Sequence, residues 1–214
     1  MIRNIYILLL LSLSFGTVTD IDGNVYETVQ IGDQLWMAEN LQVTHYNDGS
    51  EIPNPSDDNW QSNQGQYGVY DNEHFNADIY GNLYNWADVD DDRGVCPDGW
   101  HVPSYEEWTI LTDYFGGASV AGGKMKSTGT IQDGDGLWNY YSDEITEEAT
   151  NESGFTVLPA GYKLRNLGLY DAMGTIGYFW SSSVVNDESG FNGNAWYRLL
   201  YFNSSGVNRF NTYD

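Results

Sequence analysis

The chain has 214 residues and carries 31 acidic side chains against 8 basic ones, so its formal net charge at pH 7 is −23. A chain of this length can form one domain with a substantial core. The strong negative charge argues against binding to nucleic acid or to anionic membrane surfaces, because both would repel the protein.

The N-terminal residues have the features of a secretory signal peptide. Arg3 precedes an apolar run over residues 5–11, and small residues follow as far as Gly16. The run is too short to cross a membrane, and such a leader is removed on export. We therefore expect a signal peptide at residues 1–16 and a single domain over residues 17–214. The mature protein is expected to be secreted or held at the cell surface, without membrane insertion.

Two hairpins are predicted next. An Asp-Gly-Asn turn at residues 22–24 separates two β-rich runs, and a second strand-turn-strand pattern spans residues 29–38. Residues 47–66 are polar and contain two prolines, so we expect an irregular surface segment there.

Two helices are predicted in the middle of the chain. Apolar side chains recur at helical spacing over residues 80–87, which indicates the first helix. The second is expected over residues 104–115, because Ser104 and Glu107 form a capping box ahead of an apolar stripe. Two glycines follow and end it. A further turn of helix is expected within residues 121–126.

The remaining chain reads as loops and strands. Residues 129–154 are rich in Gly, Asp and Glu and indicate long loops, whereas strand patterns occupy residues 154–162, 177–183 and 195–202. A turn and a short final run follow. The predicted fold class is α+β, with two main helices, short antiparallel strands and long loops.

A series of short motifs runs through the chain in a particular order and spacing. They occupy residues 34–41, 84–86, 96–104, 107–108, 154–155, 158–162, 178–182 and 195–198. Their succession resembles the Fibrobacter succinogenes major paralogous domain over nearly all of the expected mature chain. Members of that family are secreted or surface proteins of bacteria and lack a generally assigned activity. The resemblance thus implies a bacterial extracellular module.

A more distant resemblance implies a fold. Residues 102–108 and 167–174 are similar to two elements of formylglycine-generating enzymes, which have a C-type-lectin-like fold. Those enzymes need paired cysteines near the C-terminus, whereas this chain has Cys96 alone. The three histidines are isolated in sequence, and the chain contains no common catalytic motif. We therefore expect a C-type-lectin-like binding domain and no enzyme activity.

The C-terminus departs from the family pattern. Family members usually continue past the region of Arg209 into a strand of the type Gly-Phe-Ser-Val-Arg-Cys, whereas this sequence stops at Asp214. The resemblance therefore implies that the last strand is missing. It also implies that Cys96 lacks the disulfide partner that the family would supply.

Two acidic runs are candidate calcium sites, and Ca²⁺ is the one cofactor that the sequence suggests. They supply the carboxylates of Asp88, Asp90, Asp91 and Asp92 in one segment and of Asp133 and Asp135 in another. Carboxylate oxygens are ligands that Ca²⁺ prefers, although acidic runs are often only solvated. An EF-hand pattern beginning at Asp133 fails, because Trp138 stands where that loop needs glycine.

The C-terminal strands carry the candidate ligand contacts. These are Tyr178, Trp180, Trp196, Tyr197 and Arg198, which offer aromatic stacking and one cationic hydrogen-bond donor. Alternate strand residues face opposite sides, so several of the five must belong to the core. The predicted partner is an extracellular glycan or a protein surface. Two alternatives stay open: a structural module of a larger surface assembly, and a ligand-display domain diversified by a retroelement.

Overall fold

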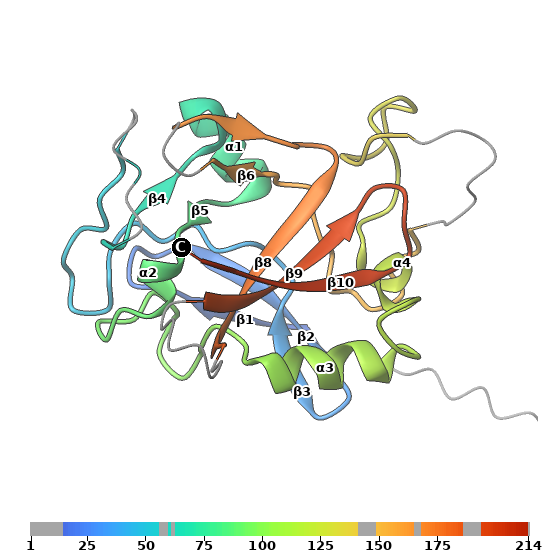
Figure 1. Cartoon of the computed structure of the whole chain (residues 1–214), viewed down its shortest axis with the longest axis horizontal. Coiled ribbons are helices and arrows are strands. Elements are labelled where there is room, and N and C mark those ends of the chain that lie inside the picture. Colours follow the sequence, from blue (N-terminus) through green and yellow to red (C-terminus); the bar gives the residue numbers. More distant parts are fainter. Residues whose placement is uncertain are drawn as a thin grey trace, which may run out of the picture.

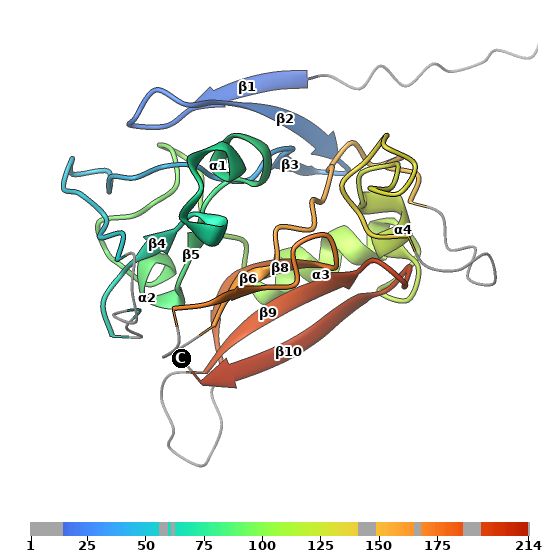
Figure 2. The same cartoon turned by 90° about the horizontal axis from the view of Figure 1, so that it is seen from above.

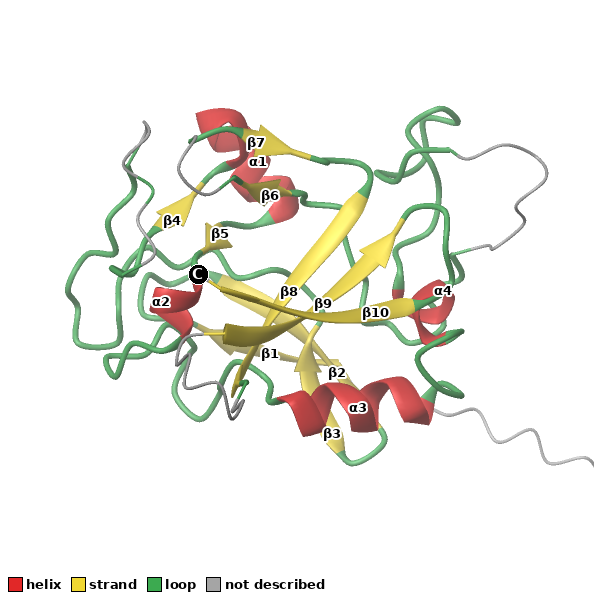
Figure 3. Cartoon of the chain, in the orientation of Figure 1, coloured by secondary structure: helices red, strands yellow, loops and turns green. Residues whose placement is uncertain are grey.

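The computed structural model describes residues 15–55, 60, 63–140, 149–164, 168–185 and 194–213. Within them the chain combines a few helices with short antiparallel strands, as predicted. Two three-stranded sheets form opposite sides of the molecule, and helix α3 (Tyr105–Tyr114) lies along the edge between them (Figures 1 and 2). Loops connect most of the other elements (Figure 3).

The first sheet contains both hairpins predicted near the N-terminus. Its strands are β1 (Phe15–Thr19), β2 (Val25–Ile31) and β3 (Gln34–Met37), paired antiparallel in that order. In the first turn, Oδ1 of Asp20 accepts hydrogen bonds from the backbone N–H groups of Asp22 and Asn24, at 3.0 and 2.9 Å. β1 overlaps the end of the expected signal peptide, whose residues 1–14 lie outside the described residues.

The segment predicted to be irregular forms loops in its described part, but it is not confined to the surface. Ile52 is 3% exposed and Trp60 is 8% exposed, so both side chains belong to the core. The segment leads into β4 (Tyr67–Gly68) and a 3₁₀ turn, η1 (Tyr70–Asn72).

The helix predicted over residues 80–87 is wrong. Instead, α1 (His74–Tyr80) ends there, β5 (Leu83–Tyr84) pairs with β4, and α2 (Trp86–Val89) follows. Gly81 breaks the helical path with a φ of 75°, which favours glycine. The Asn85 side chain then accepts a hydrogen bond from the N–H of Asp88 and starts α2.

The second predicted helix is confirmed as α3. The side chain of Ser104 accepts from the N–H of Glu107, and the Glu107 carboxylate accepts from the N–H of Ser104, so both halves of the capping box are present. Gly116 and Gly117 follow with φ values of 99° and 102°. These values lie in the region where glycine is favoured, and the helix ends before them.

The next part of the chain is largely loop, as predicted. The expected turn of helix is α4 (Ala121–Met125), and the short strands β6 (Tyr162–Lys163) and β7 (Tyr170–Asp171) pair with each other. The strand predicted over residues 154–162 is mostly wrong, since before β6 it contributes a single bridge, from Val157. Positive φ values at Thr156 and Gly161, 60° and 69°, interrupt the extended backbone.

The second sheet confirms the C-terminal strands. It consists of β8 (Ile176–Val184), β9 (Asn194–Tyr201) and β10 (Val207–Tyr213), with β9 in the middle and both neighbours antiparallel to it. The pairing of β8 with β9 is regular from Ile176 to Trp180 and shifts in register before Val184. The regular part places the aromatic side chains considered below.

Trp108 of α3 links the two sheets. Its ring centroid lies 5.3 Å from that of Trp36 on β3, 6.0 Å from that of Phe155 and 5.6 Å from that of Phe179 on β8. Its indole N–H donates to the backbone carbonyl of Trp180 at 3.2 Å. The side chain is 1% exposed, so one residue combines core packing with a satisfied polar group.

Lys126 holds the turn between β9 and β10. Its Nζ donates to the backbone carbonyls of Tyr201, Phe202 and Ser204 at 3.1, 3.4 and 2.9 Å. The side chain is 1% exposed, and burial of an ammonium group is tolerated only when such partners replace water. The lysine therefore fixes the path of the chain between the two strands.

The capping box gives a direct stability test. Ser104→Ala removes the side-chain acceptor at the N-terminus of α3, so we expect the free energy of unfolding to fall by about 1 kcal/mol. Urea denaturation followed by tryptophan fluorescence measures this loss. Ser104→Thr keeps the hydroxyl and should retain most of the stability; equal losses in the two variants would contradict the role of the cap.

Candidate ligand-binding site

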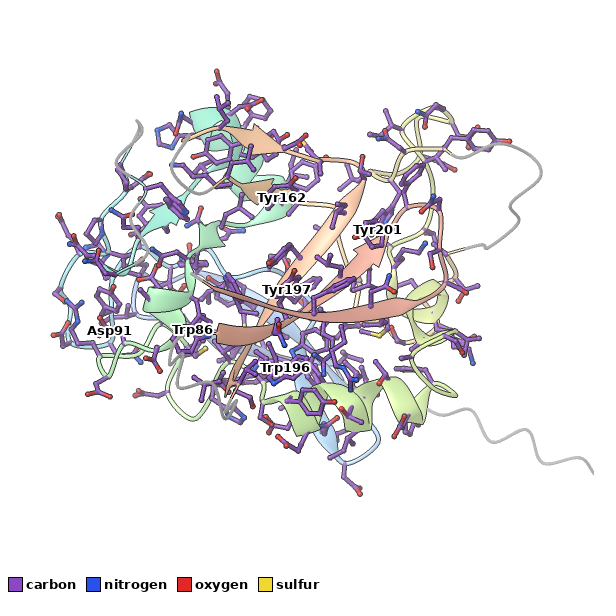
Figure 4. All side chains as sticks on the ribbon, in the orientation of Figure 1. Trp86, Asp91, Tyr162, Trp196, Tyr197 and Tyr201 are labelled. Carbon is purple, nitrogen blue, oxygen red and sulfur yellow. The ribbon has the colours of Figure 1, made fainter. Side chains whose placement is uncertain are left out.

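One face of the second sheet carries a row of aromatic side chains. Tyr178 and Trp180 lie two residues apart on β8 and therefore point to the same side. Tyr197 of β9 lies opposite Trp180, and Phe210 of β10 lies opposite Tyr197. We call these four residues the aromatic face. It points away from α3, and in Figure 4 Tyr197 is labelled on the side of β10 opposite to α3.

The four rings form a continuous set of contacts. Tyr178 and Tyr197 are stacked, with centroids 4.6 Å apart and an interplanar angle of 12°. Trp180 stands edge-on to both, at 5.5 and 5.8 Å, and Phe210 stacks on the far side of Tyr197 at 5.8 Å. Phe210 is 45% exposed and the other three are half-buried. The rings are thus held in place while part of their surface stays accessible.

Neighbouring elements hold the end of the row. The indole N–H of Trp180 donates to the backbone carbonyl of Tyr84 on β5 at 2.9 Å, which fixes the orientation of the ring. Tyr162 of β6 extends the row, since its ring lies 6.2 Å from that of Tyr178. A rigid aromatic surface loses little conformational entropy when it binds a ligand.

A cavity of about 420 Å³ adjoins the aromatic face, and its walls include Tyr178 and Trp180. Asn82, Asn85 and Lys163 contribute polar groups to the same walls. The Nδ2 group of Asn82 donates to a backbone carbonyl at 2.8 Å, but its buried Oδ1 accepts no hydrogen bond from the described residues. This oxygen is fully buried, so the walls that a ligand in the cavity would meet are mainly aromatic and apolar.

The structure separates the five predicted ligand contacts. Tyr178, Trp180 and Tyr197 lie together, but Trp196 and Arg198 point to the opposite face, toward α3. Arg198 is 3% exposed, and its guanidinium lies 4.8 Å from the ring centroid of Tyr105. Arg198 therefore does not lie beside Tyr178, Trp180 and Tyr197, and its role as a cationic donor stays a prediction. Alternation along β9 is the reason, because neighbouring strand residues face opposite sides.

Sequence reasoning missed Phe210, Tyr162 and the cavity. Phe210 could have been found from strand alternation. It lies two residues from both Asn208 and Thr212, so the three side chains share one face of the last run and Phe210 is the aromatic one among them. Tyr162 and Asn82 come from distant segments, and no local pattern places them beside β8.

The first acidic run is divided between different surroundings. Asp88 is fully buried, and its Oδ1 accepts the hydroxyl hydrogen of Tyr46 at 2.6 Å. Asp91 instead forms an ion pair with Arg93 at 2.7 Å. The remaining two, Asp90 and Asp92, are exposed. The four carboxylates therefore do not converge on one point.

The second acidic run serves its own loop. Oδ2 of Asp133 accepts from the hydroxyl of Thr130 at 2.6 Å, and Oδ1 of Asp135 accepts from the backbone N–H of the same threonine at 2.9 Å. Across the residues that the structure describes, no three His, Cys, Asp or Glu side chains are grouped to hold a metal ion. Calcium binding by either run stays a prediction.

Burial accounts for the described cysteine, and local partners account for two histidines; the third, His74, is exposed at the start of α1. Burial raises the pKa of the Cys96 thiol to about 11, so it stays protonated at neutral pH. His45 contacts Asp22 at 2.6 Å, and His101 contacts Glu107 at 2.9 Å.

Comparison with known proteins gives one match. A family model described as the Fibrobacter succinogenes major domain matches residues 29–211, which is most of the chain. No curated protein and no solved structure matches. Among the described helices, none has both the length and the apolar character needed to cross a membrane.

The buried carboxyl of Asp88 predicts a pH-dependent stability. Burial, the largest cause, raises its pKa from 3.8 to about 6, so the folded state holds this proton more tightly than the unfolded state. Stability should therefore fall as the pH rises from about 4 to about 7. A shift of about two pH units corresponds to about 3 kcal/mol.

Asp88→Asn removes this titration while keeping an acceptor for Tyr46. Urea denaturation in EDTA should show the wild type losing stability relative to this variant across that pH range. Asp92→Asn, at an exposed position in the same run, is the control and should follow the wild type. A constant difference between wild type and Asp88→Asn at every pH would contradict the prediction.

Proposed function

The chain belongs to the Fibrobacter succinogenes major domain family, and on that premise we propose that it is a secreted or cell-surface bacterial module that binds extracellular glycan. The observation that carries the proposal is the continuous contact of four aromatic rings across three neighbouring strands. Its members come from β8, β9 and β10, so the sheet itself sets their spacing.

The chemistry of this surface suits a sugar. A pyranose ring has a flat side of C–H groups, which packs on the negative face of an aromatic ring. Phe210, the most exposed ring of the aromatic face, offers such a surface at the end of the row. Its hydroxyl groups need hydrogen-bond partners, and the hydroxyl groups of Tyr178 and Tyr197 on the aromatic face can both donate and accept. A sugar presents both an apolar side for the rings and hydroxyl groups for the tyrosines, which favours glycan.

We further propose that the fold is C-type-lectin-like. Two small antiparallel sheets, one principal helix and long loops between them support this assignment. The proposal includes no catalytic step. Calcium has no grouped ligands in the described residues, so the binding experiment compares the protein with and without it.

The aromatic face predicts the effect of two substitutions. Tyr197→Ala removes the central ring and Phe210→Ala removes the most exposed one. A glycan array probed with the purified protein, with added calcium and with EDTA, identifies the ligand, and calorimetry on the strongest hit measures affinity. Each variant should bind at least tenfold more weakly, which corresponds to about 1.4 kcal/mol.

Phe75→Ala is the matched control, because Phe75 on α1 is also exposed, at 59%, but does not belong to the aromatic face. Its affinity should equal that of the wild type. Tyr197→Phe should retain most of the binding, since the ring remains. An array without a hit in either condition would count against the glycan and favour a structural module, in which a neighbouring domain covers the rings.

A further inference from the structure

Two arginines face each other across the second sheet. Arg198 of β9 lies directly opposite Arg209 of β10, and both side chains point to the face that α3 covers in part. Like charges in directly opposed positions of an antiparallel pair destabilise a sheet. With 31 acidic residues in the chain, an arginine opposite an arginine is an arrangement that needs an explanation.

These two cations have no carboxylate partner in the part of the chain that the structure describes. The ion pairs found there involve His45, Arg93, His101 and Lys124. Arg198 is nevertheless 3% exposed, and a buried charge normally has an opposite charge beside it. Burial lowers the pKa of Arg198, and the charge of Arg209 lowers it further.

Aromatic rings hold both guanidinium groups in one place. Their central carbons lie 4.8 and 5.1 Å from the ring centroid of Tyr105, and that of Arg209 lies 5.5 Å from the ring centroid of Trp196. Arg198 also donates to the backbone carbonyl of Tyr105 at 3.3 Å, while Arg209 donates to the hydroxyl of the same residue. Cation–π contacts of this kind orient the groups but do not neutralise them.

The residues around the two arginines add positive electrostatic potential and leave the site open to solvent. Tyr105 is the first residue of the ten-residue helix α3, whose N-terminal end carries a partial positive charge. Arg209 is exposed, and Trp196 and Tyr105 are half-buried, so a ligand can reach Arg209 from solvent. Arg198 is buried beside it and adds its positive charge without direct contact. In Figure 4, Trp196 lies between β10 and α3, away from Tyr197.

We propose that Arg198 and Arg209 form an anion-binding site for the carboxylate of an acidic sugar. A carboxylate can accept two parallel hydrogen bonds from a guanidinium, and its charge would offset the repulsion between the two arginines. Trp196 and Tyr105, both half-buried beside Arg209, give the sugar ring an adjacent apolar surface. The site is separate from the aromatic face, because the two lie on opposite sides of the same sheet.

The net charge of the protein limits the kind of acidic ligand. A polymer with a carboxylate on every residue would be repelled by a chain of net charge −23. A saccharide with a single carboxylate feels mainly the nearby arginines, because salt screens charges beyond about 8 Å at physiological ionic strength. The class of ligand is therefore a mostly neutral saccharide that carries one uronic acid.

The experiment titrates the purified chain with methyl glucuronide and with methyl glucoside. Binding is followed through the NMR signal of the Trp196 indole N–H, assigned by its loss in Trp196→Phe. We expect the glucuronide to shift this signal and the glucoside to bind at least tenfold more weakly. Added salt should weaken binding of the glucuronide, because the contact is ionic.

Arg209→Gln tests the site without removing a buried group, and we expect at least tenfold weaker binding of the glucuronide. Arg93→Gln is the matched control at another exposed arginine and should bind as the wild type does. Tyr197→Ala should also keep the affinity for the glucuronide, which separates this site from the aromatic face.

Three results would overturn the proposal. They are equal binding of the two sugars, equal binding by wild type and Arg209→Gln, and tighter binding of a peptide with a single glutamate than of the glucuronide. The last result would assign the arginine pair to a protein partner.

Discussion

The indole of Trp108 is the contact on which the mutual arrangement of the two sheets depends. Its ring packs against Trp36 of the first sheet and Phe179 of the second, and its N–H is bonded to the backbone of Trp180. The capping box fixes where α3 begins, and so fixes the position of this residue along the helix. Because the backbone of Trp180 is held from one side by Trp108, its side chain can be presented on the other. Trp180 of β8 thus joins the two: its backbone is bonded to Trp108 in the core, and its side chain belongs to the aromatic face.

The second sheet presents different chemistry on its two sides. One side has neutral aromatic rings beside a cavity with amide groups. The other has a pair of arginines close to the N-terminus of α3. Neighbouring residues of β9 supply both, since Tyr197 points one way and Arg198 the other. A ligand preference can therefore be assigned to one side of β9 at a time, but not to the strand as a whole, because its two sides belong to different surfaces.

Local sequence signals predicted the parts of the fold that depend on local chemistry. The Asp-Gly-Asn turn placed the first hairpin, and Ser104 with Glu107 placed the start of α3. The prediction of a helix over residues 80–87 was wrong because Gly81, with its positive φ, interrupts the helical backbone. The apolar spacing used for that prediction also occurs in short strands and turns. The site depends on pairing between strands, which one sequence does not reveal. The five candidate contacts therefore lie on strands that the sequence predicted, but their division between two faces appeared only with the register of β8, β9 and β10.

Lys126 lies at the turn between β9 and β10, and from there it influences how both surfaces are displayed. Its ammonium group holds the carbonyls of the turn that joins β9 to β10. A slip of one residue in β10 would turn Phe210 toward α3 and Arg209 toward the aromatic rings. With that slip opposed by a buried lysine, substitutions at alternate positions of the strands can alter one surface and spare the other. The two surfaces can then change independently on one hairpin.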